Sequence, residues 1–174
     1  TPIYNCLINK KTTNTPIWFM RQAGRYLPEF RKIRRSNSNF IKLTLNYKLS
    51  SKITLQPLER FNLSAAIIFS DILLVPYGLG QKVVFKKKIG PQLGILDLEK
   101  IYKNNESTFS KNLFPVYKTI NNVKQNSLLK NKDLIGFVGA PWTLLVYMIN
   151  QSSPKNKLVK NFFADETLIN QTLK

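Results

Sequence analysis

Short apolar runs alternate along the chain with longer stretches in which apolar residues keep helical spacing. Residues 17–20, 65–69 and 134–138 are continuous apolar runs, typical of strands buried on both faces of a parallel sheet. A stretch with helix signals follows each run. The order βα, βα, βα predicts an α/β protein built from about three right-handed units. Such units form either a doubly wound sheet or a (β/α)8 barrel, and the pattern leaves both open.

The helix signals are specific enough to place four helices and one hairpin. One helix should start at Pro28-Glu29, where proline suits the first turn and an acid complements the helix dipole. The other three are expected over residues 47–61, where Pro57 must kink or end the helix, 108–129 and 142–149. The turn-rich residues 76–91 enclose Val83-Val84-Phe85, which indicates a small β-hairpin insertion.

The composition indicates one globular unit. The chain has 174 residues, 43% of them hydrophobic, and its apolar runs are far shorter than the roughly 20 residues that cross a bilayer. With Cys6 as the one cysteine and no histidine, we expect neither an internal disulfide nor a metal site. The start of the chain does not resemble a secretory leader, so the sequence does not support a secretory origin.

The positive charge is spread unevenly between lysine and arginine. The chain carries 27 Lys and Arg against 9 Asp and Glu, a net charge of +18, which alone would suggest an anionic partner. The 21 lysines are scattered, whereas five of the six arginines, Arg21, Arg25, Arg31, Arg34 and Arg35, fall within fifteen residues. Because a guanidinium binds carboxylate or phosphate with two parallel hydrogen bonds, this cluster indicates anion recognition.

Polar residues follow each predicted strand. Arg21 follows the first, Asp71 the second, and Gly139-Ala140-Pro141-Trp142 the third, with Tyr147 one or two helical turns beyond. In both architectures the active site lies at the carboxyl ends of the strands, so we expect these residues at one rim.

Each of these residues also has a structural interpretation. Asp71 can be a helix cap or turn residue, although a carboxylate between apolar runs is costly to bury without a partner. Arg21 and Arg25 can form a surface ion pair with Glu29. Tyr147 can be a core tyrosine, and Trp18 and Trp142 are expected to pack in the core.

Four segments, in the same order, resemble the uroporphyrinogen decarboxylase family. Residues 16–30, Pro-Ile-Trp-Phe-Met-Arg-Gln-Ala-Gly-Arg-Tyr-Leu-Pro-Glu-Phe, carry its most specific motif. Thr54-Leu55-Gln56-Pro57, the run from Ala65 to Leu73 with Ser70-Asp71, and the run from Gly136 to Leu144 complete the resemblance. Ser64 departs from it, because the family usually has aspartate before the Ala-Ala-Ile strand.

The resemblance implies a partial (β/α)8 TIM barrel and a cytoplasmic homodimer of the porphyrin and heme pathway. The family removes CO2 from the four acetate arms of uroporphyrinogen III, giving coproporphyrinogen III, without metal or prosthetic group. Since the family is about twice as long, we expect residues 1–174 to be the N-terminal part of a single catalytic domain. We expect this part neither to fold stably nor to catalyse alone, because three strands leave an open sheet edge.

The resemblance also implies roles for individual residues. Arg21, Ala23 and Arg25 match the substrate-binding loop, with Arg34 at its outer end and Gln22 as a neighbour. Asp71 matches the aspartate that faces the pyrrole N–H groups, and Tyr147 matches a tyrosine of the pocket. Asp71 and Arg21 are the expected catalytic residues: Asp71 would stabilise a ring made cationic by protonation, and Arg21 would position a carboxylate.

Two other functions stay open. A corrinoid-dependent methyltransferase on the related barrel uses zinc, whose ligands would lie outside this chain, but such relatives are not expected to keep the segment from Arg21 to Arg25. A basic nucleic-acid-binding module would use the net charge, although no interleaved base-stacking aromatics are present.

Overall fold

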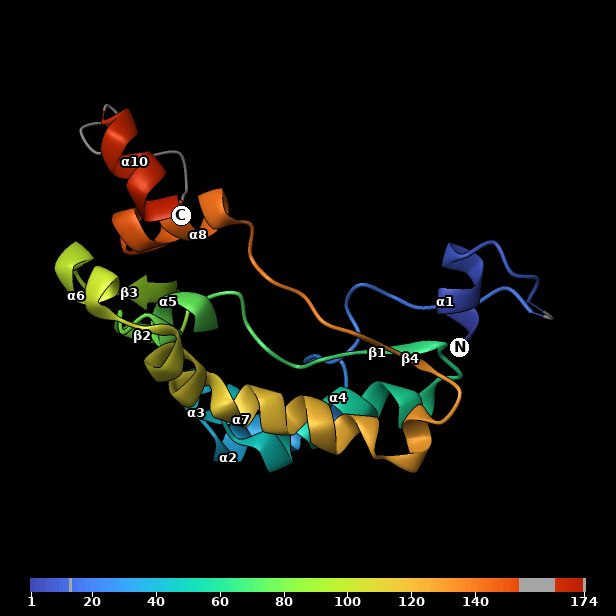
Figure 1. Ribbon diagram of the computed structural model, residues 1–174. Coiled ribbons are helices and arrows are strands. Elements are labelled where there is room, and N and C mark those ends of the chain that lie inside the picture. The colour runs from blue at the N-terminus through green and yellow to red at the C-terminus, as the bar shows by residue number, and fades with distance from the viewer. Residues whose placement is uncertain (13, 154–164, 174) are drawn as a thin grey trace. The chain divides into compact units, whose positions relative to one another are not determined.

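The computed structural model describes residues 1–12, 14–153 and 165–173 of the chain (Figure 1). In chain order, the elements are α1 (Pro2–Leu7), α2 (Pro28–Ser36), α3 (Phe40–Thr44), α4 (Tyr47–Arg60), β1 (Ala65–Ile67), α5 (Leu74–Gly78), β2 (Val83–Lys86), β3 (Gly90–Leu93), α6 (Leu98–Lys103), α7 (Glu106–Lys124), η1 (Ser127–Leu129), β4 (Asp133–Ile135), α8 (Pro141–Asn150) and α10 (Glu166–Leu173). The chain divides into two compact units. The first comprises Thr1–Ser38, Lys42–Ser70 and Pro115–Phe137, and the second comprises Asn39–Ile41, Asp71–Phe114 and Val138–Lys174.

The first unit is built on a parallel pair of strands, β1 and β4 (Figure 1). Ala65 lies opposite Asp133, and Ile67 lies opposite Ile135. Ala65 and Ala66 are fully buried, and α4 packs against β1. One apolar cluster joins α4, β1, α7 and η1: Leu55, Leu58, Leu63, Ala66, Ile68, Val123 and Leu129. The pair therefore has a core behind it, as the predicted α/β pattern requires.

Helix α4 confirms the helix expected over residues 47–61. It begins after Asn46, whose side chain accepts a hydrogen bond from the Leu49 N–H. Pro57 lies inside the helix, which continues to Arg60, so proline does not end it there. The Thr54 hydroxyl accepts a 2.9 Å hydrogen bond from the Phe69 N–H, which ties the segment after β1 to the helix.

The second unit contains the predicted hairpin. Strands β2 and β3 are antiparallel, with Val83 opposite Leu93 and Lys86 opposite Gly90. Gly90 has φ +100°, a conformation that favours glycine at the turn. The Gln81 side-chain amide donates to the Gly94 carbonyl at 2.9 Å and to the Met148 carbonyl at 3.0 Å. This amide joins the hairpin to α8, the helix predicted after Pro141.

The strand predicted over residues 17–20 is wrong. Backbone pairing there is limited to Ile17, whose carbonyl accepts the Ser64 N–H and whose N–H donates to the Ser64 hydroxyl. Phe19 and Met20 are 61% and 80% exposed. An apolar run becomes a strand only where a neighbouring strand continues the pairing, and among the described residues none does so beyond Ile17. The described residues thus contain two of the three predicted sheet strands.

Other boundaries differ by a few residues. The runs 65–69 and 134–138 form the shorter strands β1 and β4, and the helix expected to reach 129 ends at Lys124 before the 3₁₀ turn η1. Helices α1, α3, α5, α6 and α10 were not predicted. Trp18 and Trp142 are 40% and 49% exposed, so their expected place in the core is wrong. None of the described helices combines the length and the apolar character that crossing a bilayer would need.

Candidate functional site

The loop from Met20 to Leu27 carries Arg21 and Arg25. It turns at Gly24, whose carbonyl accepts a 3.0 Å hydrogen bond from the Leu27 N–H, and it leads into α2 at Pro28. Leu27 is buried in a second apolar cluster with Phe30, while Arg21 and Arg25 are exposed. The loop is therefore anchored at its end and presents its cations outward.

Gln22 fastens this loop to β1. Its side-chain amide donates to the Ala65 carbonyl at 2.9 Å, and its side-chain carbonyl accepts the Ile67 N–H at 3.2 Å. The side chain is 4% exposed. It thus pairs with two backbone groups of β1 as a neighbouring strand would. Both of its polar ends are used in this way, and its role as a neighbour of the substrate stays a prediction.

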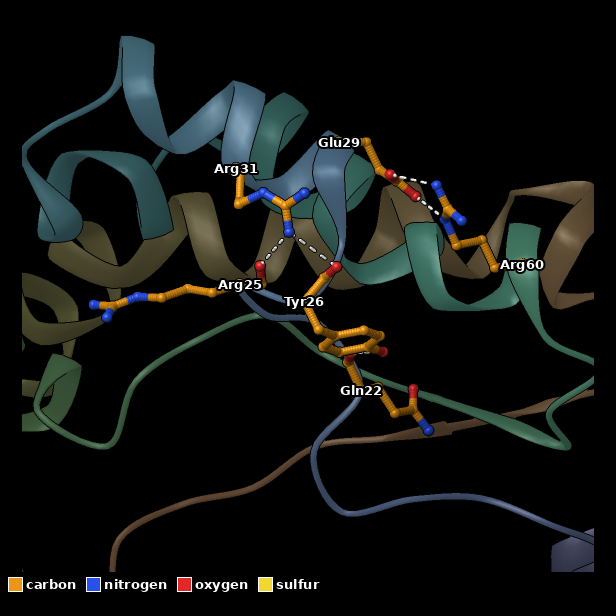
Figure 2. A network of polar contacts seen from close by, with 6 residues as sticks. All are labelled: Gln22, Arg25, Tyr26, Glu29, Arg31 and Arg60. Atoms are coloured by element: carbon orange, nitrogen blue, oxygen red, sulfur yellow. Dashed lines mark hydrogen bonds and ion pairs between the residues drawn. The ribbon is translucent and has the colours of Figure 1, made fainter.

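Two further contacts hold the same loop (Figure 2). The Tyr26 hydroxyl donates to the Gln22 carbonyl. Nη1 of Arg31, one turn into α2, donates to the Arg25 carbonyl at 2.8 Å and to the Tyr26 carbonyl at 3.1 Å. Burial raises the pKa of the Tyr26 hydroxyl, and Glu29 raises it further, so the hydroxyl stays a donor at neutral pH.

Glu29 is paired with a residue other than the two expected. Its carboxylate accepts hydrogen bonds from Arg60 at 2.5 and 2.9 Å, which joins α2 to α4 (Figure 2). The Arg60 hydrogen bond holds the pKa of Glu29 below its usual value. The alternative in which Arg21 and Arg25 pair with Glu29 is therefore wrong. Within the described part of the chain, neither guanidinium has a hydrogen bond or an ion pair.

A hollow of about 390 Å³ lies beside this loop, at the carboxyl end of β1. Its walls come from the loop and from the residues that follow the two strands: Met20, Arg21, Gln22, Ala23, Gly24, Tyr26, Ile67, Ile68, Phe69, Ser70 and Phe137. A larger hollow of about 720 Å³ lies at the amino end of β1, near Asn62 and Ser64. Because α/β enzymes place their chemistry at the carboxyl ends of strands, the smaller hollow is the candidate site.

Asp71 belongs to the second unit. Its Oδ1 accepts a 2.8 Å hydrogen bond from the Leu73 N–H, as the turn interpretation of this residue expects. Burial raises the pKa of the carboxyl, and the Leu73 N–H only partly opposes that effect. Among the described residues, no lysine or arginine pairs with this carboxylate. A half-buried acid without a cation is typical of functional sites as well as of turns.

Gly139 precedes α8 and Tyr147 lies within it, in the same unit. A Cβ at Gly139 would lie 2.6 Å from a methyl carbon of Leu144 and 3.2 Å from Ile72, so the backbone passes where no side chain fits. Tyr147 is half-buried on α8, which fits both a core tyrosine and a pocket tyrosine. Arg34, in the first unit, donates to the carbonyls of Asn37 and Ser38 at the end of α2.

The expected site residues are thus divided between the two units. Arg21, Gln22 and Ala23 share one hollow in the first unit, and Arg25 lies on the same loop. Asp71 and Tyr147 are part of the second unit. Arg31 and Ser64 bond to backbone groups, and because such contacts leave no periodic signal, they could not be predicted from the sequence.

The two sequence comparisons with known proteins agree on one family. The profile of uroporphyrinogen decarboxylase (URO-D) matches residues 1–174. The uroporphyrinogen decarboxylase of Agrobacterium fabrum is 45% identical over 147 residues, which are 84% of this chain and 42% of the relative. That of Campylobacter jejuni is 42% identical over 168 residues, 94% of this chain and 49% of the relative. That of Rickettsia felis is 39% identical over 167 residues, which are 95% of this chain and 48% of the relative.

A solved structure supports the fold. A methyltransferase from Methanosarcina mazei superposes with a TM-score of 0.68 over 99% of this chain and 50% of its own, at 16% sequence identity. At that identity the likeness concerns the fold alone. The chain spans about half the length of the curated relatives it matches. The sequence relatives at 39–45% identity and the match over all 174 residues show that the chain belongs to the uroporphyrinogen decarboxylase family.

Proposed function

We propose that this chain supplies the N-terminal part of the substrate site of a uroporphyrinogen decarboxylase. The observation that carries the proposal is the loop from Met20 to Leu27. Gln22 fastens it to β1, and it presents Arg21 and Arg25 without a partner among the described residues. Arg21 in the wall of the hollow and Arg25 on the same loop fit a substrate that carries eight carboxylates.

The proposed setting is the first part of a (β/α)8 barrel that forms one catalytic domain. The parallel pairing of β1 and β4 and the superposition with half of a solved structure support this fold. A barrel would bring the carboxyl ends of all strands to one rim, so that Asp71, Tyr147 and the arginine loop would face the same substrate. The meeting of Asp71 with Arg21 is part of this proposal.

In the proposed reaction, Arg21 and Arg25 bind carboxylate arms and fix the orientation of the ring. A guanidinium has a pKa above about 12, which makes it a poor proton donor at neutral pH, so positioning is the role that suits it. Arg34 bonds to two carbonyls at the end of α2, and its role as an outer carboxylate ligand would use its remaining N–H groups. Ala23 would allow the substrate to approach the loop backbone.

Asp71 would act on the ring itself. Loss of CO2 from an acetate arm needs an electron sink, which a pyrrole provides once a ring carbon is protonated and the ring becomes cationic. A carboxylate that accepts pyrrole N–H groups stabilises that charge as it develops. Burial alone raises the pKa of Asp71, whereas a positive ring beside it would lower that pKa and favour the carboxylate. Tyr147 would complete the wall of the pocket.

The remaining implications of the family are predictions of the same proposal. They are a homodimer in the complete enzyme, a cytoplasmic location and activity without metal or prosthetic group. The methyltransferase alternative is not favoured, because the likeness to a methyltransferase is 16% identical whereas the decarboxylases reach 45%. The chain keeps Arg21, Gln22, Ala23, Gly24 and Arg25 intact, which the decarboxylase family expects.

The test is to rebuild a complete enzyme around this chain. We would co-express residues 1–174 with the C-terminal half of the Campylobacter jejuni relative, purify the complex and assay conversion of uroporphyrinogen to coproporphyrinogen. We expect activity from this reconstituted pair and none from either half alone. A stable pair that binds no uroporphyrinogen and releases no CO2 would contradict the proposal.

A further inference from the structure

The arginine cluster separates into cations that are free and cations that hold backbone. Arg21 and Arg25 have no partner among the described residues, whereas Nη1 of Arg31 lies 2.8 Å from the Arg25 carbonyl and 3.1 Å from the Tyr26 carbonyl. Arg31 stands on α2, which Glu29 ties to α4 through Arg60 (Figure 2). Arg31, which holds the loop, thus lies on a helix that the Glu29–Arg60 ion pair joins to α4.

The backbone of Arg25 is held by the hydrogen bond from Arg31. Its side chain points away from Glu29 and from the other residues drawn in Figure 2, while its own carbonyl is one of the two that Arg31 holds. The neighbouring Tyr26 is held by the same Nη1 and by its hydroxyl on the Gln22 carbonyl. Fixing the peptide on the C-terminal side of Arg25 limits the directions in which its guanidinium can extend, which lowers the entropy lost on binding an anion.

We propose that Arg31 is a positioning residue, which orders the peptide after Arg25 so that the Arg25 guanidinium meets a carboxylate arm of the substrate. The inference rests on the proposed function and adds a role that acts through Arg25 instead of through contact with the ligand. Both hydrogen bonds come from one nitrogen, Nη1, so a lysine ammonium at position 31, which has three donors on one nitrogen, would replace part of this contact.

The first experiment requires no ligand. Hydrogen exchange, followed by mass spectrometry on peptides covering residues 22–27, would compare the reconstituted pair with its Arg31→Met and Arg35→Met variants. Arg35 is exposed on the same helix, and its replacement removes an equal charge. We expect faster exchange of this loop in Arg31→Met and the wild-type rate in Arg35→Met. Equal exchange in all three proteins would overturn the inference.

The second experiment is a double-mutant cycle on KM and kcat for uroporphyrinogen. We expect Arg31→Met to raise KM about 5- to 20-fold with kcat nearly unchanged, Arg35→Met to leave both near wild type, and Arg31→Lys to restore part of the loss. Because Arg31 acts through Arg25, the Arg25→Met/Arg31→Met double variant should be no worse than Arg25→Met alone. Losses that add would show that Arg31 binds substrate itself and would overturn the inference. A wild-type pair that binds no substrate defeats the proposed function instead, and the exchange experiment still decides whether Arg31 orders the loop.

Discussion

Asp71 has a half-buried carboxyl with a single backbone hydrogen-bond donor, the Leu73 N–H. Burial raises its pKa, so the native chain holds the proton more tightly than the unfolded chain does. Because the native pKa lies above the unfolded pKa, the free energy of unfolding falls as the pH rises between the two values. The negative charge of Asp71 weakens the fold. The proposed reaction needs that same charge beside the cationic ring.

The variant Asp71→Asn tests this directly. Asparagine keeps an acceptor for the Leu73 N–H but carries no charge. From about pH 3.9, the usual pKa of an unfolded aspartate, up through the raised native pKa, the wild-type protein should lose stability that the variant keeps. Urea unfolding of the reconstituted pair should therefore give a higher midpoint for the variant at pH 7 and equal midpoints near pH 3. Turnover should be lost; a variant that is less stable at pH 7 would contradict this account.

Arg21 is tested by the most conservative change available. Arg21→Lys keeps the positive charge but loses the two parallel hydrogen bonds to a carboxylate. With about 1.5–3 kcal/mol for a hydrogen bond to a charged group, we expect kcat/KM for uroporphyrinogen to fall by about 10- to 100-fold. Arg35→Lys, on the exposed side of α2, should keep wild-type kinetics. Normal turnover in Arg21→Lys would count against bidentate positioning.

At the scale of elements, the first unit depends on side chains that take the place of a missing strand. Gln22 pairs with Ala65 and Ile67, and Ser64 pairs with Ile17, so the edge of β1 is covered without a continuous ladder. The apolar run of β1 made this strand predictable from the sequence. The run at 17–20 looked equally apolar, yet it lacks a partner strand, and the polar contacts that replace one follow no period.

Gln22→Leu should therefore weaken the first unit. The change leaves the Ala65 carbonyl and the Ile67 N–H buried without a partner, which costs about 1–3 kcal/mol in the free energy of unfolding. Gln125→Leu is the matched control, because Gln125 is exposed on the surface of the same unit. Denaturant unfolding compares the two variants, and equal stabilities would show that the Gln22 contacts do not hold β1.

Two glycines that flank residues 137 and 138 are expected to respond differently to alanine. A Cβ at Gly139 would meet the buried Leu144 at 2.6 Å, whereas a Cβ at Gly136 meets nothing within 4 Å. Gly139→Ala should lower the unfolding free energy by about 1–3 kcal/mol, as overpacking usually does, and Gly136→Ala should leave it nearly unchanged. Thermal unfolding of both variants checks this; no loss in Gly139→Ala would mean that the start of α8 can shift.

At the scale of the whole molecule, the sequence motifs were enough to identify the family, but they did not show how many strands pair in the sheet. The motifs from Pro16 to Phe30 and around Asp71 were sufficient for the family. The chain still spans about half of its relatives, and among the described residues β4 pairs with β1 alone. Leu134 and Ile135 on β4 are only half-buried. Such an edge can accept a further strand.

Adding the C-terminal half of a relative should therefore stabilise this chain. We expect residues 1–174 alone to unfold with a shallow, poorly cooperative urea transition and the reconstituted pair to unfold cooperatively at a higher midpoint. Circular dichroism over a urea series measures both. A chain that unfolds alone at the same midpoint and with the same cooperativity as the pair would show that it is complete without a partner.

In the proposed enzyme, Arg21 and Asp71 act on one tetrapyrrole. The most direct measurement is a crystal structure of the reconstituted pair with bound coproporphyrinogen. We predict the Arg21 guanidinium on a side-chain carboxylate and the Asp71 carboxylate against the pyrrole N–H groups of the same molecule. A bound ligand that touches one of these residues while the other faces a different surface would contradict the account.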